Sequence, residues 1–577
     1  MTDMRRTLLW VVFSMSLLLL WDAWQKHNGQ PSMFSPSAPK PAAVAPGSTT
    51  GTASGSAPGA SVGTPSATTP GAATMPGQGA GSDGGAAVAT VQISTDLFRA
   101  TLSARGAELQ ALSLRQHHET EQPDKEIQLF GPEHRYFAQT GLISQQVGIA
   151  LPNHTTVFQV EPGPLELTSG QDTLSVRFTS PEVGGVQLIK TYTFHRGAYT
   201  IDVSHELRSK AAAAVSPQLY LQLTRDDVIK GNTSAFTGPV SFTGPALYSE
   251  AGKFKKFEFS DIAKNKVEYP KSTNDGWVAM VQHYFASAWV VPQAGAREFR
   301  VERVDPAGNL YRAAMVQSLG ELAPGATLKH EATLFAGPQE EKKLEALAPG
   351  LELVKDYGML TVLAKPLFWL LDKLHDGIGN WGWAIVALVV VLKIAFYWLN
   401  ASAYKSMAKM KAINPRVMEL RERLKDKPQQ MQQEMMRIYR EEKVNPLGGC
   451  LPILVQMPFF IALYWVLLSS VEMRGAPWLG WITDLSQPDA LFFTIPGINM
   501  PVGLLPILMT ASSLLQTWLN PTPPDPVQAR MMWIMPIVFS FMFFYFPAGL
   551  VLYWLTNNLL SIAQQWLINK QLGVLGK

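Results

Sequence analysis

Five apolar segments in the C-terminal third of this 577-residue chain constrain its fold more than any other feature. Each is near the roughly 20 residues that a helix needs to cross a bilayer, and charged residues are almost absent from them, although they are plentiful in the middle of the chain. We therefore predict a helical membrane region after a water-exposed one. The segments run over about 381–400, 450–470, 491–518, 530–546 and 548–568.

The N-terminal residues 1–24 predict a sixth span. Arg5 and Arg6 precede an apolar run from Leu8 to Trp21. We interpret the run as an uncleaved transmembrane anchor rather than a signal peptide, because no small-residue cleavage site follows it directly. Basic residues before the run place the N-terminus in the cytoplasm and the next residues outside.

Residues 25–90 are predicted to be a flexible linker. From Ser35 onward they are mostly Ala, Gly, Pro, Ser and Thr, with Lys40 and Asp83 as the charged residues. Such a composition cannot bury enough apolar surface to offset the entropy lost on ordering.

Residues 91–336 are predicted to form an all-β sandwich on the outer side of the membrane. Apolar and polar residues alternate in short segments that turns such as Arg196-Gly197 separate. This period of two buries one face of each strand. The apolar positions that define the pattern are Leu174, Val176, Phe178, Tyr199, Ile201, Val203, Leu219, Leu221 and Leu223.

Residues 337–380 are predicted to be helical and amphipathic. Their leucines fall at helical spacing among charged residues, which fits a helix on the membrane surface or one packed under the β-domain. These positions are Leu360, Leu363, Leu367, Leu370, Leu371 and Leu374.

We place the C-terminal core of five spans at residues 381–570. Residues 401–447 lie between its first two spans. They hold eleven Lys or Arg against six Asp or Glu, as expected of a cytoplasmic stretch. Asn414-Pro415 predicts a helix start, and Lys427-Pro428 predicts a break before a second helix.

The resulting helical hairpin has a basic surface. Such a surface is either merely solvated or a docking site for a ribosome, a nascent chain or a translocase, and composition alone leaves both interpretations open. The basic residues are Arg416, Arg421, Arg423, Lys425, Lys427, Arg437 and Arg440.

Lys393 lies well inside the first core span, seven residues before Asn400. A lysine at the centre of a spanning helix costs about 2.5–3.5 kcal/mol, so we expect it to face a water-filled cavity rather than to snorkel to the headgroups. No acidic residue inside another core span is available to pair with it.

Other polar residues in the spans extend this expectation to a hydrophilic groove. Tyr553, Asn557 and Ser561 follow a spacing of four residues and share one helix face. Hydrogen bonding between helices is the alternative role for each of them. The candidate groove residues are Lys393, Gln456, Ser512, Gln516, Tyr553, Trp554, Asn557 and Ser561.

The sequence lacks the motifs of several enzyme classes. It contains no P-loop, no Gly-x-Ser-x-Gly elbow and no His-Glu-x-x-His, and its ten histidines have no metal-ligand spacing. We therefore expect neither an enzyme nor a cofactor or metal site. The net charge of +3 gives no bulk attraction to nucleic acid, so no direct nucleic-acid readout is expected.

The motifs around these features resemble those of the YidC/Oxa/Alb insertase family. The resemblance lies in Ser406–Met410, Asn445–Pro458 and Phe546–Trp554. Gly276–Met280 and Tyr284-Phe285 in the external domain are similar to the form found in Gram-negative bacteria.

The resemblance implies a multi-pass protein of the cell inner membrane that inserts, folds and helps to assemble other membrane proteins, alone or with the Sec translocon. It implies a five-helix core with a groove open to the cytoplasm, and a periplasmic sandwich of galactose-mutarotase-like fold. The implied partners are nascent inner-membrane proteins, the Sec translocon (SecYEG and SecDF), the ribosome and membrane lipids. The family usually has an arginine where this chain has Lys393, which keeps the charge but not the bidentate geometry.

Two other functions remain as alternatives. A secondary transporter would use Lys393 as a substrate or proton site, but it predicts an inverted repeat that we do not find. A membrane-anchored sugar-processing enzyme would need converging acid and base residues in the sandwich.

Overall fold

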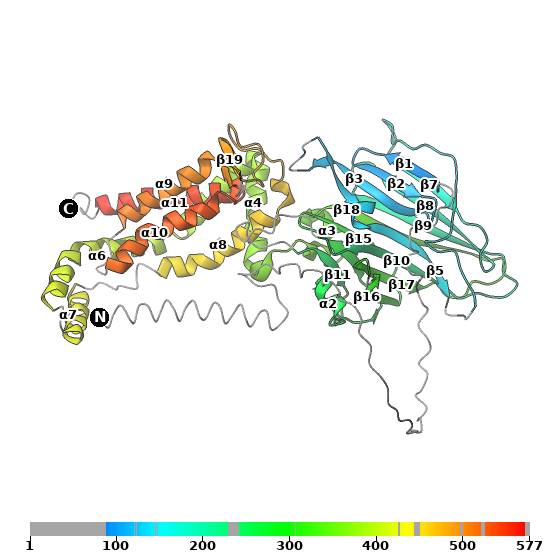
Figure 1. Cartoon of the computed structure of the whole chain (residues 1–577), viewed down its shortest axis with the longest axis horizontal. Helices are drawn as coiled ribbons and strands as arrows, with labels where there is room; N and C mark the ends of the chain where they lie inside the picture. Colours follow the sequence, from blue (N-terminus) through cyan, green and yellow to red (C-terminus); the bar gives the residue numbers. More distant parts are fainter. Residues whose placement is uncertain are drawn as a thin grey trace, which may run out of the picture.

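The protein, described from a computed structural model, has a β-rich domain beside a helical domain (Figure 1). The anchor predicted over 1–24, most of the linker predicted over 25–90, and Lys425 lie outside the described residues. The structure describes residues 75, 88–119, 122, 124–144, 146, 148–228, 242–305, 307–424, 427–442, 451–496, 500–520 and 526–571.

The β-domain consists of two antiparallel sheets of nine strands each. The first sheet has the order β1 (Thr90–Ser94), β2 (Phe98–Ser103), β3 (Glu108–His118), β5 (Phe137–Ser144), β10 (Pro217–Asp226), β17 (Leu310–Ser318), β16 (Arg297–Asp305) and β13 (Ser272–Thr273), and β4 (Glu126–Phe130) pairs with β3. The second has the order β12 (Lys255–Lys256), β11 (Gly244–Tyr248), β14 (Trp277–Val281), β15 (Phe285–Val290), β18 (Thr327–Pro338), β9 (Thr200–Ser209), β8 (Val186–His195), β7 (Thr173–Thr179) and β6 (Gln159–Val160).

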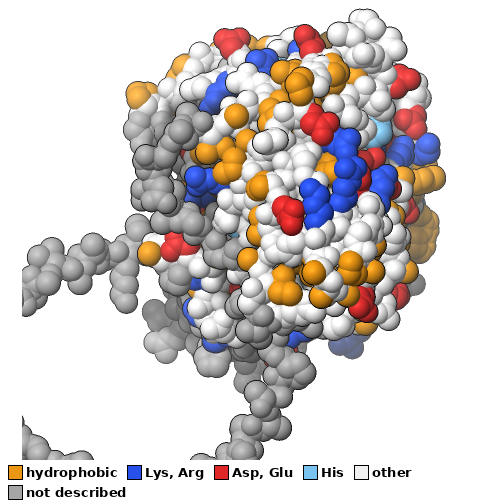
Figure 2. Space-filling view, turned by 90° about the vertical axis from the view of Figure 1, so that its right-hand side faces the viewer, with side chains coloured by type: hydrophobic (Ala, Val, Ile, Leu, Met, Phe, Trp, Pro, Cys, Tyr) orange, Lys and Arg blue, Asp and Glu red, His pale blue; other side chains and the backbone are white. Residues whose placement is uncertain are grey.

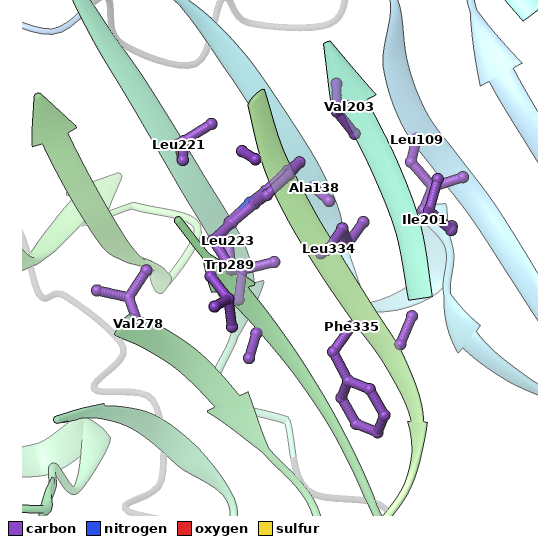
Figure 3. Packing of buried hydrophobic residues seen from close by; sticks show 14 of the residues in the cluster. Leu109, Ala138, Ile201, Val203, Leu221, Leu223, Val278, Trp289, Leu334 and Phe335 are labelled. Atoms are coloured by element: carbon purple, nitrogen blue, oxygen red, sulfur yellow. The ribbon is translucent and has the colours of Figure 1, made fainter. Parts of the chain in front are cut away.

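The predicted alternation produces the core between the two sheets. All nine apolar positions named for the pattern are buried, and they belong to one hydrophobic cluster. Figure 3 shows Leu223 of β10 beside Trp289 of β15, so side chains from both sheets meet there. The prediction of a β-sandwich followed by a helical region is confirmed.

The helices lie mainly after the sandwich. They are α2 (Phe259–Ala263), α3 (Glu341–Leu347), α4 (Thr361–Ile378), α5 (Trp381–Ala395), α6 (Tyr397–Arg423), α7 (Pro428–Glu441), α8 (Leu451–Ser469), α9 (Leu504–Leu519), α10 (Pro526–Phe543) and α11 (Ala548–Gln571). Short 3-10 helices are η1 (Pro132–His134), η2 (Leu351–Val354), η3 (Gly358–Leu360) and η5 (Val471–Met473), and β19 (Phe493–Ile495) pairs with β20 (Met500–Val502).

The first core span is shorter than predicted. The helix expected over 381–400 ends at Ala395, and α6 continues at 69° to α5. Phe396 lies at this bend with φ −93° and ψ 12°, outside the helical range, although its N–H still donates to the carbonyl of Leu392 as in a regular helix.

The expected helix start at Asn414-Pro415 is wrong. α6 runs from Tyr397 through Pro415 to Arg423. Ile413, Val417 and Leu420 form a buried face on both sides of the proline, and this packing outweighs the hydrogen bond that proline cannot make.

The third predicted span, 491–518, also begins later. Its first part forms the hairpin of β19 and β20, and α9 begins only at Leu504. Pro496 and Pro501 disfavour an earlier helix. The carboxylate of Asp489 accepts the N–H of Leu505 at 2.8 Å and so satisfies a free donor in the first turn of α9.

No helix of the described chain reaches, by itself, the length and hydropathy of a membrane span. The bent pair of α5 and α6 meets that standard together. Shorter apolar helical stretches occur at Val455–Ser469, Leu504–Leu519 and Ala529–Phe543.

The helix α4 packs against the helical domain. Ala364, Leu367, Phe368 and Leu371 are buried in a second hydrophobic cluster that also includes residues of α5, α8 and α11. Its opposite side leaves Trp369 59% exposed.

Lys355 joins the β-domain side of the molecule to the helical domain. Its side chain is fully buried, with Nζ at 3.0 and 3.1 Å from the carboxylate oxygens of Glu472 and 3.8 Å from the ring centre of Phe368. Nearby, His283 Nε2 lies 2.9 Å from the carbonyl oxygen of Leu468. The two domains are thus connected by specific polar contacts.

Candidate functional site

Lys393 is the centre of the candidate site. It lies on α5, is partly buried, and donates from Nζ to the hydroxyl of Ser561 on α11 at 2.6 Å. The Ser561 hydroxyl in turn donates to the carbonyl of Asn557 at 2.7 Å, so its oxygen is free to accept from the ammonium. Across the described parts of the chain, no carboxylate forms an ion pair with Lys393.

A cavity of about 20 Å³ borders this lysine. That volume is enough for about one water molecule. Side chains of α5, α8 and α11 form its wall together with Phe396, which lies between α5 and α6; the others are Val389, Leu392, Lys393, Gln456, Phe459, Phe460, Tyr553 and Asn557. The site is therefore a narrow gap between α5, α8 and α11, called the polar gap here for the four polar side chains in its wall; the other five are apolar, with aromatic rings on the α8 side.

Five of the eight predicted groove residues come together here. Lys393, Gln456, Tyr553 and Asn557 line the cavity, and Ser561 holds the lysine. α11 aligns the last three of these, because residues four apart lie above one another on a helix.

The structure places the other three predicted residues elsewhere. Ser512 on α9 donates to the carbonyl of Met509 and accepts from Asn558, so it joins α9 to α11. Trp554 packs its ring on Phe543 of α10, with ring centres 4.3 Å apart. Gln516 on α9 is partly buried and is not among the residues that line the cavity.

Asn400 is a site residue that sequence reasoning missed. It is 4% exposed at the start of α6, and its side-chain oxygen accepts from Gln456 Nε2 at 3.1 Å. An asparagine in an apolar stretch, where an unpaired amide would be costly, was the available signal. Phe459 and Phe460 were missed because aromatic residues in a span give no such signal.

The hairpin of α6 and α7 exposes most of its described basic residues. Arg416 pairs with Glu442 at 2.9 Å, and Arg437 pairs with Glu441 at 2.8 Å. Arg423, Lys427 and Arg440 are exposed, whereas Arg421 is partly buried.

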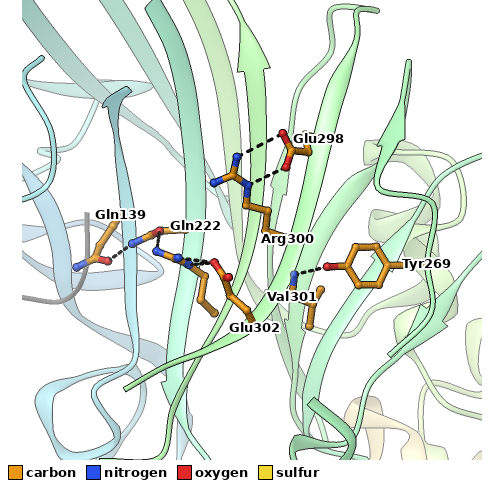
Figure 4. A network of polar contacts seen from close by, with 8 residues as sticks. Gln139, Gln222, Tyr269, Glu298, Arg300, Val301 and Glu302 are labelled. Carbon is orange, nitrogen blue, oxygen red and sulfur yellow. Dashed lines mark hydrogen bonds and ion pairs between the residues drawn. The ribbon is translucent and has the colours of Figure 1, made fainter. Parts of the chain in front are cut away.

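A second group of buried polar side chains lies in the β-domain (Figure 4). Gln139 donates to Glu108 at 2.5 Å and accepts from Gln222 at 2.6 Å, and Arg312 connects Gln222 with Glu302. Burial raises the pKa of the Glu108 carboxyl to about 7. These groups satisfy one another, which is the pattern of a structural network.

The outer end of the β-domain has acidic and basic side chains beside one another (Figure 2). Ion pairs such as Arg177 with Glu161 at 3.3 Å occur in the second-sheet region. Among the described residues, no three His, Cys, Asp or Glu side chains are grouped so that they could hold a metal ion.

Comparison with known families gives two adjoining matches. Residues 90–370 match the model of the YidC periplasmic domain, and residues 373–573 match the model of the 60Kd inner membrane protein.

Curated relatives match the chain over nearly its full length. The membrane protein insertase YidC of Cupriavidus metallidurans is 54% identical, over 99% of this chain and 98% of that protein. The proteins of the same name from Burkholderia cenocepacia and Janthinobacterium sp. (strain Marseille) are 51% and 50% identical, and 99% of this chain aligns with 99% and 100% of them, respectively.

Solved structures also resemble the chain. A crystal structure of an active YidC insertase with its first transmembrane domain resolved is 17% identical, covers 82% of this chain and 93% of that one, and gives a TM-score of 0.38. A galactose mutarotase-like protein from Lactobacillus casei is 11% identical, covers 43% of this chain and all of that one, and gives a TM-score of 0.31.

Proposed function

Because this chain belongs to the YidC family of membrane protein insertases, we propose that it inserts proteins into the cell inner membrane through the polar gap between α5, α8 and α11. Because the chain belongs to this family, we prefer the insertase function to the two alternatives, a secondary transporter and a sugar-processing enzyme. The expectation that the chain is not an enzyme agrees with the family.

The observation that supports the mechanism is Lys393, whose Nζ has a serine hydroxyl as its partner and no carboxylate among the described residues. An ammonium has three donors, and one is used by Ser561. An acidic residue of an incoming segment would supply a counter-charge, which offsets part of the roughly 2.5–3.5 kcal/mol cost of a charge inside the bilayer.

The polar wall beside this lysine lowers the barrier for a hydrophilic segment. Gln456 and Asn557 line the same cavity, so hydrogen-bonding groups replace some of the water that the segment loses. The apolar helix of the substrate then leaves sideways into lipid. No nucleotide is required, since burial of a spanning helix contributes about 0.8 kcal/mol per CH₂.

The orientation and the partners are parts of the same proposal. The basic excess in 401–447 favours a cytoplasmic hairpin, and the β-domain is then periplasmic. The exposed basic residues of α6 and α7 suit a ribosome, a nascent chain or the Sec translocon as a partner. Lipids would contact the apolar outer surface of the helices.

Replacement of Lys393 tests the mechanism directly. We expect Lys393→Glu to reduce insertion of a single-span substrate with an acidic tail about tenfold more than insertion of the same substrate with a neutral tail, and Lys393→Arg to keep most of the activity. Insertion is measured by protease protection of the tail in cells depleted of the wild-type protein.

Lys373→Glu is the matched control, because Lys373 is an exposed lysine of α4 that belongs neither to the hairpin of α6 and α7 nor to the cavity. Equal loss with both tails would contradict charge attraction. Normal insertion of both substrates by the Lys393→Glu variant would contradict the polar gap as the route.

A further inference from the structure

The outer face of the first sheet holds an apolar patch that is separate from the sandwich core. On β10 the leucines at 219, 221 and 223 point inward, so Tyr220 points to the opposite face. Val316 of β17 is the register partner of Tyr220, and Ala314 follows on the same face. With Ile143 of β5 these residues form a cluster of their own, and each is at most 6% exposed.

Met75 lies on this patch. It is 8% exposed and belongs to the same cluster, although it comes from the segment that composition predicts to be a linker. Between Ser35 and Thr90 it is the only apolar residue larger than valine. Fourteen residues lie between it and Thr90, and such a chain spans up to about 50 Å, so the contact is within reach.

The chemistry of the patch fits an apolar anchor. The Tyr220 hydroxyl accepts the N–H of His154 at 3.1 Å, and the amide of Gln222 is bonded to Gln139 at 2.6 Å. These polar groups at the border of the patch therefore have partners. An apolar side chain that covers the patch is stabilised by the hydrophobic effect and leaves no polar group unpaired. Methionine is unbranched and adapts its shape to an irregular gap between strands.

We propose that the outer face of the first sheet is a docking surface for the linker of the same chain, with Met75 as the anchor. The contact at residue 75 would fix one point of the linker predicted over 25–90 to the β-domain. The N-terminal membrane anchor is then connected to the middle of a sheet face rather than to β1 at the edge of the sheet, which restricts how the β-domain turns above the membrane.

Disulfide trapping in the full-length protein tests the contact. In a Cys450→Ser background, Met75→Cys with Val316→Cys should form a disulfide within the chain under mild oxidation at least tenfold faster than Met75→Cys with Ser175→Cys. Ser175 is an exposed residue of β7 in the second sheet, so the control cysteine is more accessible but on another face. Equal rates for the two pairs, or a disulfide that joins two chains, would overturn the proposal.

Methionine oxidation tests the unsubstituted protein and does not depend on the folding of a variant. Met436 on α7 is 50% exposed and serves as the reference. With dilute peroxide and peptide mass spectrometry, we expect the sulfoxide at Met75 to form at least fivefold more slowly than at Met436. Oxidation of Met75 as fast as of Met436 would show that the anchor is not docked.

Discussion

The β-domain and the helical domain differ in what they expose. The β-domain keeps Trp277 and Trp289 at no more than 1% exposure and presents charged side chains outside (Figure 2). The helical domain leaves Trp398, Ile394 and Trp518 82%, 70% and 67% exposed. Large apolar side chains on the outside are unfavourable in water and favourable in lipid. Each surface therefore matches a different solvent.

The two domains also differ in how they treat a buried lysine. In the β-domain, Lys190 is fully buried and donates to the carbonyls of Gly106 and Thr140 at 2.6 and 2.7 Å, and burial lowers its pKa to about 7. Lys393 has a hydroxyl partner and lies beside a small cavity. A lysine held by two backbone carbonyls supports a fold, whereas one held by a single hydroxyl has more donors left for a substrate.

The largest effect is expected from truncation of a tryptophan in the β-domain. Trp289→Ala removes a side chain that is fully buried and donates to the carbonyl of Gln222 at 3.1 Å. We expect the free energy of opening of β10 to fall by about 3–5 kcal/mol, as measured by amide hydrogen exchange in the full-length protein. Trp398→Ala, at an exposed site on α6, should change this value by less than about 0.5 kcal/mol. Similar losses at both sites would remove the contrast between the domains.

The contact between the domains should show the next largest effect. Lys355→Ala leaves the partly buried Glu472 without its cation, and we expect the ends of α8 and β15 to lose about 2–3 kcal/mol of protection against exchange. Lys365→Ala is the control. Its pairs with Glu352 and Glu341 span 3.5 and 3.7 Å, and it is 36% exposed, so we expect less than about 1 kcal/mol. A double-mutant cycle with Glu472→Ala that shows no coupling would argue that the two domains do not depend on this pair.

The pH dependence of the free energy of unfolding should reveal the buried Glu108 of the β-domain, because exposed carboxyl groups contribute little to it. The pKa of Glu108 is raised by burial from about 4.5 to about 7, so between these values the folded state keeps a proton that the unfolded state has lost. The contribution of Glu108 to the free energy of unfolding should therefore fall as pH rises from about 4.5 to 7, by up to about 1.4 kcal/mol per pH unit, whereas His117, whose pKa burial lowers to about 4, contributes in the opposite direction.

Glu108→Gln stays neutral and should flatten this slope. Urea denaturation of the β-sheet circular dichroism signal between pH 4.5 and 7 measures it. An unchanged slope in the variant would assign the pH dependence to another group.

The sandwich could be predicted from the sequence because its signal is local. Leu219, Leu221 and Leu223 alternate within one strand, and burial of one face follows directly. The pairing of Glu108, Gln139 and Gln222 could not be predicted, since β3, β5 and β10 meet through a strand order that no short segment encodes.

The candidate site was predictable to a similar degree. Lys393 is conspicuous in an apolar span, and the spacing of Asn557 and Ser561 shows that they share a face. Ser512 and Trp554 could not be assigned correctly, because a nearly uniform apolar helix does not reveal which side faces which neighbour.

The smallest effect on stability is expected at the hairpin of α6 and α7. Arg437 pairs with Glu441 and Glu434 on the surface of α7, and such fully exposed pairs contribute little to stability because solvent screens them. Arg437→Gln should therefore leave thermal unfolding of the purified protein almost unchanged. If the hairpin is a docking site, combining Arg437→Gln with Arg423→Gln and Arg440→Gln should nevertheless weaken co-sedimentation with ribosomes severalfold, more so at low salt because exposed charges are screened at high salt. Unchanged co-sedimentation at low salt would mean that the basic surface is only solvated, and the helical domain would then have Lys393 as its one functional cation among the described residues.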